Sequence, residues 1–186
     1  LERKRSIYAF RLISCWLMCL LLLCSAVPDK LQNSAGPDES TVKALFVYNF
    51  TKQIEWPAHV MNTQKFVITV LGDSPVKDRL NIVLKGRRIF DKPVEIRGAM
   101  SIDDIQTTQI LYVSKSHSAK LQKILEQMDD KGILIVTEDK GMAAKGSCIN
   151  IIQKDETLKF ELNDVSIKKQ GLKVSNQLYN LAVTIR

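Results

Sequence analysis

Histidine and cysteine are scarce in this chain of 186 residues, which has two histidines and four cysteines. Neither His59 nor His117 has a histidine, cysteine or glutamate nearby at the spacing that metal ligands require. Glycine-rich phosphate loops, dinucleotide-binding fingerprints and the nucleophile elbow of serine hydrolases are also absent. The sequence therefore indicates no catalytic residue, no metal ligand and no cofactor, and we expect a protein that is not an enzyme.

Three of the four cysteines lie within residues 1–26, so Cys148 is the only one in the rest of the chain. Residues 1–26 have the layout of a cleaved secretory signal peptide, with basic residues, an apolar run, and small Cys24 and Ala26 before the cleavage site. A membrane anchor and a lipoprotein site at Cys24 are the rival interpretations. An exported protein with one cysteine cannot form an internal disulfide, so Cys148 is a free thiol, either buried or reactive. Its position at the start of an apolar run favours burial.

Charge and length limit the remaining classes of protein. The formal net charge is +7, but the basic residues are scattered and are not interleaved with aromatic side chains, so we expect no nucleic-acid partner. A composition of 45% hydrophobic residues is enough for one sizeable core. We expect a signal peptide at residues 1–26, a flexible lead-in at 27–40, and one domain at 41–186 of an exported protein.

Residues 42–57 predict the first helix of this domain. Ser40 or Thr41 can cap its start, and Pro57 can stop it, because the residue before a proline disfavours helical angles. Apolar residues recur every three or four positions, so they should form one stripe that packs on a sheet. The expected stripe consists of Val42, Leu45, Phe46, Asn49, Phe50 and Ile54.

Three later segments, residues 65–71, 109–114 and 133–137, are short apolar runs rich in β-branched residues. Such runs are typical of strands buried on both faces. Helical patterns at 75–84 and 119–128 separate them, which favours right-handed crossovers between parallel strands.

Residues 149–162 predict an antiparallel hairpin at one edge of the sheet. Asn163 or Asp164 can cap the next helix, and Ser175 can cap a last helix whose apolar stripe reaches Ile185. We therefore expect a single-domain α/β fold with a mixed, mainly parallel sheet of about six strands, flanked by helices, and an antiparallel hairpin near the C-terminal end.

Polar residues follow two of the buried strands. Asp73 and Ser74 follow the first strand, and Glu138 follows the third. The carboxyl ends of parallel strands meet at one edge of a sheet, where open α/β sheets commonly bind ligands. These residues are therefore candidates for binding a small ligand, or for the acid and base of an uncharacterised hydrolase. The simpler interpretation is that they cap helices and form turns.

Four short motifs follow one another in residues 41–186: Y-N-F-x-K-x-x-E-W-P, L-G-D-S-P, F-E-L-N and G-L-x-x-S. The ordered set resembles the YfiR-like family of periplasmic proteins. The single Cys148 departs from better-known relatives, which carry cysteine pairs, so their disulfide switch does not carry over. The first motif, which we interpret as structural, falls on Tyr48, Asn49, Phe50, Lys52, Glu55, Trp56 and Pro57.

The resemblance implies a periplasmic sensor that holds the periplasmic part of an inner-membrane diguanylate cyclase inactive, which lowers cyclic-di-GMP and biofilm formation. A domain that binds one conformation of a membrane enzyme better than another shifts the population without any catalytic group. A sensor kinase is the other kind of membrane partner, and a homodimer is expected from the resemblance. The alternative function is a periplasmic small-ligand-binding protein that serves a transporter or a sensor kinase.

The second strand of the hairpin provides the candidate docking surface. Lys159, Glu161 and Asn163 alternate with Phe160 and Leu162, so the three polar residues should share one face. A polar face on an edge hairpin can contact a partner, and Glu161 is the main candidate.

Overall fold

The computed structural model describes residues 38–186. The predicted signal peptide and residues 27–37 of the predicted lead-in lie outside the described part. In chain order the elements are α2 (Glu39–Thr51), β1 (Ile54–Glu55), β2 (Phe66–Leu71), α3 (Val76–Val83), β3 (Arg88–Ile89), β4 (Lys92–Ala99), η2 (Ile102–Asp104), β5 (Ile110–Val113), η3 (Lys115–Lys120), α4 (Leu121–Gln127), β6 (Leu134–Thr137), β7 (Ile149–Lys154), β8 (Thr157–Leu162), α5 (Asp164–Lys169), β9 (Lys173–Val174), α6 (Asn176–Leu181) and β10 (Thr184–Ile185).

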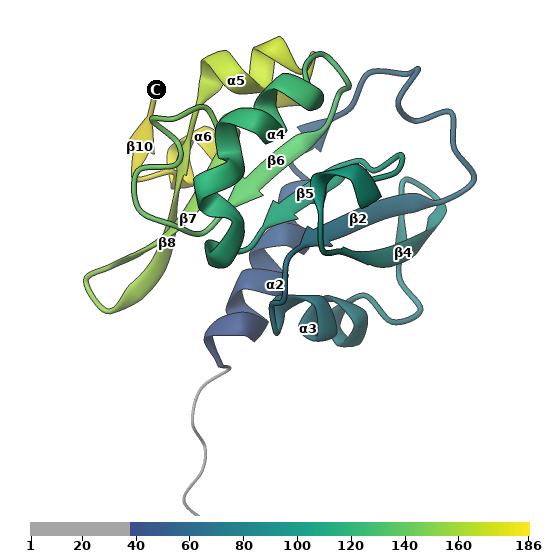
Figure 1. The fold of residues 1–186 in the computed structure, drawn as a ribbon, viewed down its shortest axis with the longest axis horizontal. Coiled ribbons are helices and arrows are strands. Elements are labelled where there is room, and N and C mark those ends of the chain that lie inside the picture. The colour runs from purple at the N-terminus through teal and green to yellow at the C-terminus, as the bar shows by residue number, and fades with distance from the viewer. Residues whose placement is uncertain (1–37) are drawn as a thin grey trace, which may run out of the picture. The chain divides into compact units, whose positions relative to one another are not determined.

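An eight-stranded sheet forms the centre of the fold, in the order β10-β8-β7-β6-β5-β2-β4-β3. The pairs from β4 through β2, β5 and β6 to β7 are parallel, whereas β8 runs antiparallel to β7 and β3 antiparallel to β4. α4 lies in front of the sheet in Figure 1, and α2 passes behind it. The predicted α/β class with a mixed, mainly parallel sheet is confirmed.

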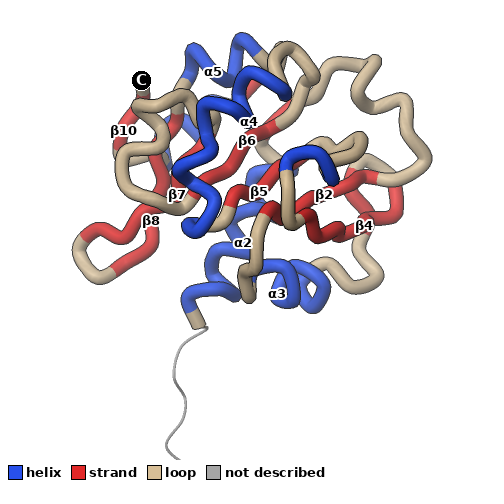
Figure 2. The backbone as a smooth tube through the Cα atoms, viewed as in Figure 1, coloured by secondary structure: helices blue, strands red, loops and turns tan. Residues whose placement is uncertain are grey.

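The sheet has more strands than the predicted six because short strands extend both edges. β3 and β10 have two residues each, which is too short for a periodicity in the sequence to reveal them. β10 pairs in parallel with Glu161 and Leu162 of β8. The prediction that the β7–β8 hairpin forms the sheet edge is therefore wrong for the second half of β8, although the tip of the hairpin projects beyond the helices (Figure 2).

The first helix starts earlier and ends sooner than predicted. The side chain of Asp38 caps it by accepting a hydrogen bond from the Thr41 N–H at 3.1 Å, so neither Ser40 nor Thr41 is the cap. α2 ends at Thr51, well before Pro57. The sequence in between forms β1, which pairs antiparallel with β9 from near the C-terminus. A long-range strand pairing thus overrides the local helical pattern, and no local signal announces it.

α2 also buries a different face from the one predicted. Its buried residues are Ala44, Val47, Phe50 and Thr51. Leu45 is 38% exposed and Asn49 is exposed. The aromatic rings explain the rotation: Phe50 stacks with Phe46 at 6.0 Å and meets Phe160 of β8 edge-on at 5.2 Å, so this pair fixes which side of α2 faces the sheet.

Two helix caps near the C-terminus agree with the sequence patterns. Asn163 caps α5 by accepting from the Ser166 N–H at 2.9 Å, and Ser175 caps α6 by accepting from the Leu178 N–H at 3.2 Å. The prediction that the last helix reaches Ile185 is wrong, because α6 ends at Leu181 and Ile185 belongs to β10. Pairing with β8 again outweighs a helical periodicity.

Gly72 at the end of β2 occupies a site that excludes any side chain. Its φ of +89° lies in the left-handed region, and a Cβ there would come within 2.3 Å of His117 Nδ1 and of Ser114 Oγ. Its N–H donates to the Ala99 carbonyl at 2.7 Å. The ends of β2, β4 and β5 therefore meet at a backbone position that only glycine can occupy without strain.

We expect Gly72→Ala to lower the free energy of unfolding by about 3 kcal/mol, from the positive φ and the contact with the ring of His117. Gly141 is the matched control, because its φ is +78° and nothing lies within 4 Å of an added Cβ. Gly141→Ala should cost only about 1 kcal/mol. Urea unfolding followed by circular dichroism measures both, and equal losses would show that Gly72 is not packed as described.

Candidate functional site

A polar pocket of about 490 Å³ opens at the carboxyl end of β6, between the start of α2 and the β7–β8 hairpin. We name it the Glu138 pocket. Its lining combines charged side chains with an apolar wall on the hairpin. The lining residues are Glu39, Lys43, Lys115, Glu138, Asp139, Lys140, Gly141, Ile151, Ile152, Gln153, Leu158 and Glu161.

An ion pair between α2 and the end of β6 forms the inner wall of the pocket. Lys43 Nζ lies 2.5 Å from Glu138 Oε2 and 2.6 Å from Glu39 Oε1. The side chains of Lys43 and Glu138 are only 13% and 9% exposed. Glu138 Oε1 also accepts a hydrogen bond from the Lys115 N–H at 3.0 Å. Both carboxylate oxygens of Glu138 are therefore already engaged.

The pair holds Lys43 in its charged form. Burial disfavours the ammonium, but hydrogen bonds to Glu138 and Glu39 outweigh it and raise the pKa of Lys43 above its ordinary value. The stabilisation that this shift represents is present below the ordinary lysine pKa and is lost only as pH rises through the raised value. A nucleophilic or basic lysine needs a lowered pKa, so Lys43 is unsuited to catalysis.

Asp139 is held as a carboxylate in the same loop. It accepts hydrogen bonds from Ser118 Oγ at 2.8 Å and from the Lys140 N–H at 2.9 Å. These bonds, that from Ser118 first, lower the pKa of Asp139 below its usual range. A general acid must be protonated near neutral pH, and Asp139 has the opposite shift.

Glu161 stands on the opposite wall and is fixed from the core of the sheet. Asn150 Nδ2 donates to Glu161 Oε2 at 3.0 Å, and Asn150 Oδ1 accepts from Thr137 Oγ1 at 2.8 Å. Asn150 and Thr137 are both fully buried. A chain of hydrogen bonds thus runs from β6 through β7 to Glu161 on β8 and orients its carboxylate at the rim of the pocket.

The three residues predicted for partner binding separate in the structure. Lys159 and Glu161 are half-buried on the same side of β8, and Lys159 Nζ lies 3.3 Å from the Asp155 carboxylate. Asn163 is only 9% exposed, and its amide donates to the Ala143 carbonyl at 2.7 Å in addition to capping α5. Asn163 therefore supports the fold where a surface contact was expected.

The three residues predicted for ligand binding also separate. Asp73 and Ser74 follow β2, and Glu138 follows β6. Both strands end at the carboxyl edge of the sheet, but β5 lies between them. Glu138 lines the pocket, whereas Asp73 and Ser74 are not among its lining residues. Ser74 Oγ accepts from the Val76 N–H at 3.3 Å at the start of α3, and Asp73 is exposed.

The pocket also uses residues that the sequence reasoning missed. Lys43 stands one helical turn after Glu39, a spacing that predicts an ion pair on a helix. Asn150 interrupts an apolar strand, and a buried amide there needs hydrogen-bonding partners. The sequence contains both signals, but it does not predict the contacts that α2, β6 and β8 make with one another.

Several residues of the Y-N-F-x-K-x-x-E-W-P motif take part in packing. Trp56 is 5% exposed, donates from Nε1 to the Gln109 carbonyl at 3.2 Å and meets Phe66 edge-on at 5.3 Å. The Tyr48 hydroxyl accepts from Arg87 Nη1 at 3.1 Å. Glu55, which is exposed, forms an ion pair with Lys173 at 3.1 Å. Phe50 lies in the core, Asn49 is exposed and Pro57 is half-buried.

Cys148 lies in the core at 1% exposure, between α4, α5 and the sheet. Burial raises the pKa of the Cys148 thiol to about 12. The thiolate is the reactive form of cysteine, so this thiol is shielded both sterically and electrostatically.

Two features associated with transport and catalysis, a membrane-spanning helix and a metal-binding cluster, are absent from the described residues. Within residues 38–186, no helix combines the length and apolar character needed to span a membrane. In the same residues, histidine, cysteine, aspartate and glutamate side chains form no group of three or more that could hold a metal ion.

Comparison with known proteins identifies a family. A family model described as YfiR/HmsC-like matches residues 40–183. No curated protein sequence matches the chain. A solved structure of a conserved domain protein from Vibrio cholerae O1 biovar El Tor superposes with a TM-score of 0.56 at 6% identity, over 80% of this chain and 60% of that one, which is a likeness of fold alone.

A second solved structure, the ABC domain in complex with L-Trp from Streptococcus pneumoniae, superposes with a TM-score of 0.49 at 10% identity, over 73% of this chain and 60% of that one. The present chain thus spans about 60% of the length of each of these two solved chains.

We expect Lys43→Met to lower the free energy of unfolding by about 2 to 4 kcal/mol, because it leaves the carboxylate of Glu138 buried without its cation. Lys168→Met is the control, since the Lys168 side chain in its ion pair with Asp164 is 73% exposed and should be worth less than about 1 kcal/mol. Urea unfolding measures both.

Replacing both partners of the buried pair should recover most of the loss. The double variant Lys43→Met, Glu138→Met removes the uncompensated charge and keeps the side-chain volume similar. A double variant no more stable than Lys43→Met would show that the pair does not act as a unit.

We expect Cys148 to react with a disulfide reagent at least about 100-fold more slowly in the native chain than in urea, because reaction requires opening of the core. The modification is measured by mass spectrometry on the peptide that contains Cys148. Val165→Cys provides a control thiol, since Val165 is 71% exposed. Equal native rates at the two positions would contradict the burial of Cys148.

Proposed function

The chain belongs to the YfiR/HmsC-like family, and from that premise we propose that it is a periplasmic regulator that binds and represses an inner-membrane signalling protein without catalysis of its own. The partner we propose is the periplasmic part of a diguanylate cyclase, so that binding controls cyclic-di-GMP and biofilm formation. A sensor kinase is the other partner of this class. Export by the signal peptide and formation of a homodimer belong to the same proposal.

The single observation that carries the proposal is the state of the charged groups in the Glu138 pocket. Glu138 is paired with Lys43, Asp139 is held ionised, and Glu161 accepts from Asn150. Each group is held in position by an ion pair or a hydrogen bond to its neighbours, as in a recognition surface. A catalytic lysine needs a lowered pKa and a general acid a raised one, whereas the pKa of Lys43 is raised by its hydrogen bonds to Glu138 and Glu39 and that of Asp139 is lowered by its hydrogen bond from Ser118.

Lys159 and Glu161 on β8 form the docking face that we propose. Both residues lie on β8 of the hairpin whose tip projects beyond the helices (Figure 2), and Glu161 lies in the half of β8 that pairs with β10. Two opposite charges at fixed positions favour a partner surface with the complementary pattern and disfavour others. Repression then follows if this face binds the inactive conformation of the partner more tightly than the active one.

The alternative function, binding of a small ligand, is favoured by the size of the Glu138 pocket. Its volume of about 490 Å³ lies within the range of about 300 to 1,000 Å³ that is typical of ligand sites. Ile151 and Leu158 offer an apolar wall opposite the charged residues. A ligand in this pocket would lie beside Glu161, and could therefore act as the signal that changes docking.

The proposal is tested by affinity capture of the tagged full-length chain from detergent-solubilised envelope of its own host. We expect co-purification of a diguanylate cyclase or a sensor kinase, identified by mass spectrometry. Lys159→Glu and Glu161→Arg should each reduce its recovery at least about tenfold, because each reverses a charge at the docking face. Cellular cyclic-di-GMP should rise in the same variants when the partner is a cyclase.

Glu126→Arg is the matched control, since Glu126 is an exposed carboxylate on α4. Unfolding curves of all variants separate loss of docking from loss of folding. Unchanged capture by Lys159→Glu and Glu161→Arg would exclude this face. A small molecule that co-purifies with the chain while no membrane protein does would favour the ligand-binding alternative.

A further inference from the structure

The outer side of β4 is an open sheet edge. On its inner side, β4 pairs with β2 from Val94 to Ala99. On its outer side, β3 covers only Lys92 and Pro93. Among residues 38–186, no strand pairs with the outer side of β4 beyond Pro93. This edge lies at the opposite end of the sheet from β8 (Figure 1).

The backbone groups on this edge point outward at every second residue. The Ala99 carbonyl accepts from the Gly72 N–H on the β2 side, which sets the alternation along β4. The N–H and C=O groups of Val94, Ile96 and Gly98 therefore face away from β2. No described residue pairs with them, so they are available to an added strand.

A groove of about 420 Å³ runs beside the open edge and is positively charged. Val94, Ile96 and Leu84 supply its apolar surface. Lys85 and Arg88 are exposed at its rim together with Arg87, and no acidic residue lines it. Apolar side-chain sites next to an open backbone edge are the features that strand addition uses.

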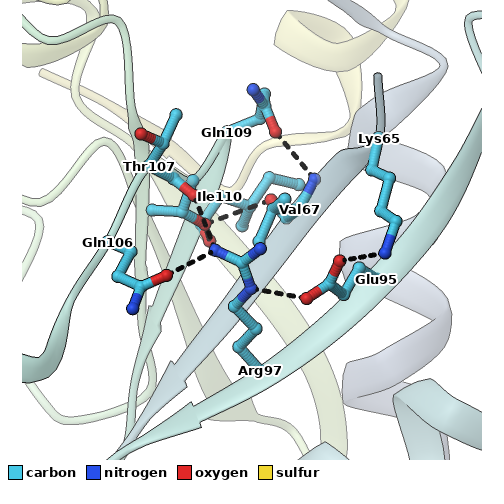
Figure 3. Close-up of polar contacts among 9 residues, drawn as sticks. Lys65, Val67, Glu95, Arg97, Gln106, Thr107, Gln109 and Ile110 are labelled. Carbon is cyan, nitrogen blue, oxygen red and sulfur yellow. Dashed lines mark hydrogen bonds and ion pairs between the residues drawn. The ribbon is translucent and has the colours of Figure 1, made fainter. Parts of the chain in front are cut away.

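The one acidic side chain on this part of β4 is neutralised on the other face of the strand. Figure 3 shows the Glu95 carboxylate between Arg97 Nε at 2.7 Å and Lys65 Nζ at 2.8 Å. Hydrogen bonds from Arg97 and Lys65 lower the pKa of Glu95 to about 2. Glu95 therefore stays ionised and paired, and does not offset the charge of the groove.

We propose that the open edge of β4 binds an extended acidic segment of another protein as an added strand. The outward backbone groups would provide the hydrogen bonds, and the cations of the groove would select glutamate or aspartate at alternate positions. A second copy of this chain fits less well, because pairing two such edges would bring two cationic grooves together. The site is separate from the face of Lys159 and Glu161, so the two proposals stand or fall independently.

The test measures binding of a fluorescein-labelled peptide of alternating threonine and glutamate to the full-length chain by fluorescence anisotropy. We expect this peptide to bind at least about tenfold more tightly than its threonine and lysine counterpart. The same glutamate peptide with an N-methyl group on every residue should bind at least about tenfold more weakly, because neither of its edges can then donate hydrogen bonds to β4. The proposal would be overturned if the lysine peptide bound as tightly as the glutamate peptide. It would also be overturned if the N-methylated glutamate peptide bound as tightly as the unmethylated one.

Variants and hydrogen exchange locate the site. Lys85→Glu combined with Arg88→Glu should weaken binding of the glutamate peptide about five- to tenfold, whereas Lys123→Glu on the exposed side of α4 should not change it. The peptide should slow amide exchange at Val94, Ile96 and Gly98. Slow exchange at these amides before the peptide is added would show that the edge is already covered by another segment or a second copy, and would overturn the proposal.

Discussion

The buried ion pair between Lys43 and Glu138 is the contact on which the arrangement of the pocket depends. It joins the start of α2 to the end of β6, two segments that are adjacent only in the folded chain. Removing two charges from water costs several kcal/mol each, so the pair contributes little net stability relative to apolar side chains. Its larger effect is on specificity, because any displacement of α2 along the sheet would leave a charge unpaired. The same pair fixes the inner wall of the Glu138 pocket.

The sequence predicts the parts of this fold that depend on local patterns. Apolar runs identify β2, β5 and β6, and the capping residues Asn163 and Ser175 mark the starts of two helices. It fails where a distant partner decides the structure: β1 forms because β9 pairs with it, and Ile185 joins a strand because β8 is beside it. Pairing between segments that are far apart has no local signal, whereas capping and burial do.

In the candidate site, too, the sequence predicts what depends on local patterns and fails where distant segments meet. The position of Glu138 after a buried strand predicts that it lies at the carboxyl edge, and it does line a pocket there. The sequence cannot tell that β5 separates it from Asp73, because strand order is not written in any one segment. Nor can it reveal the contact of Glu138 with Lys43, which depends on how α2 packs. The side chains that complete the pocket come from elements whose neighbours only the topology determines.

In the docking that we propose, Glu161 is better suited to discriminate between conformations of a partner than an exposed lysine of the surface, because it is held from the core of the sheet. A tenfold preference requires about 1.4 kcal/mol, more than one exposed ion pair commonly supplies. Glu161 is half-buried, and its bond from Asn150 has already restricted its rotamers, so binding it costs less side-chain entropy. Asn150 in turn is held by Thr137 in the buried core. The carboxylate of Glu161 thus belongs to the same hydrogen-bonded network as the sheet, and in the docking that we propose a partner conformation that misplaces its own charge would pair with it less well.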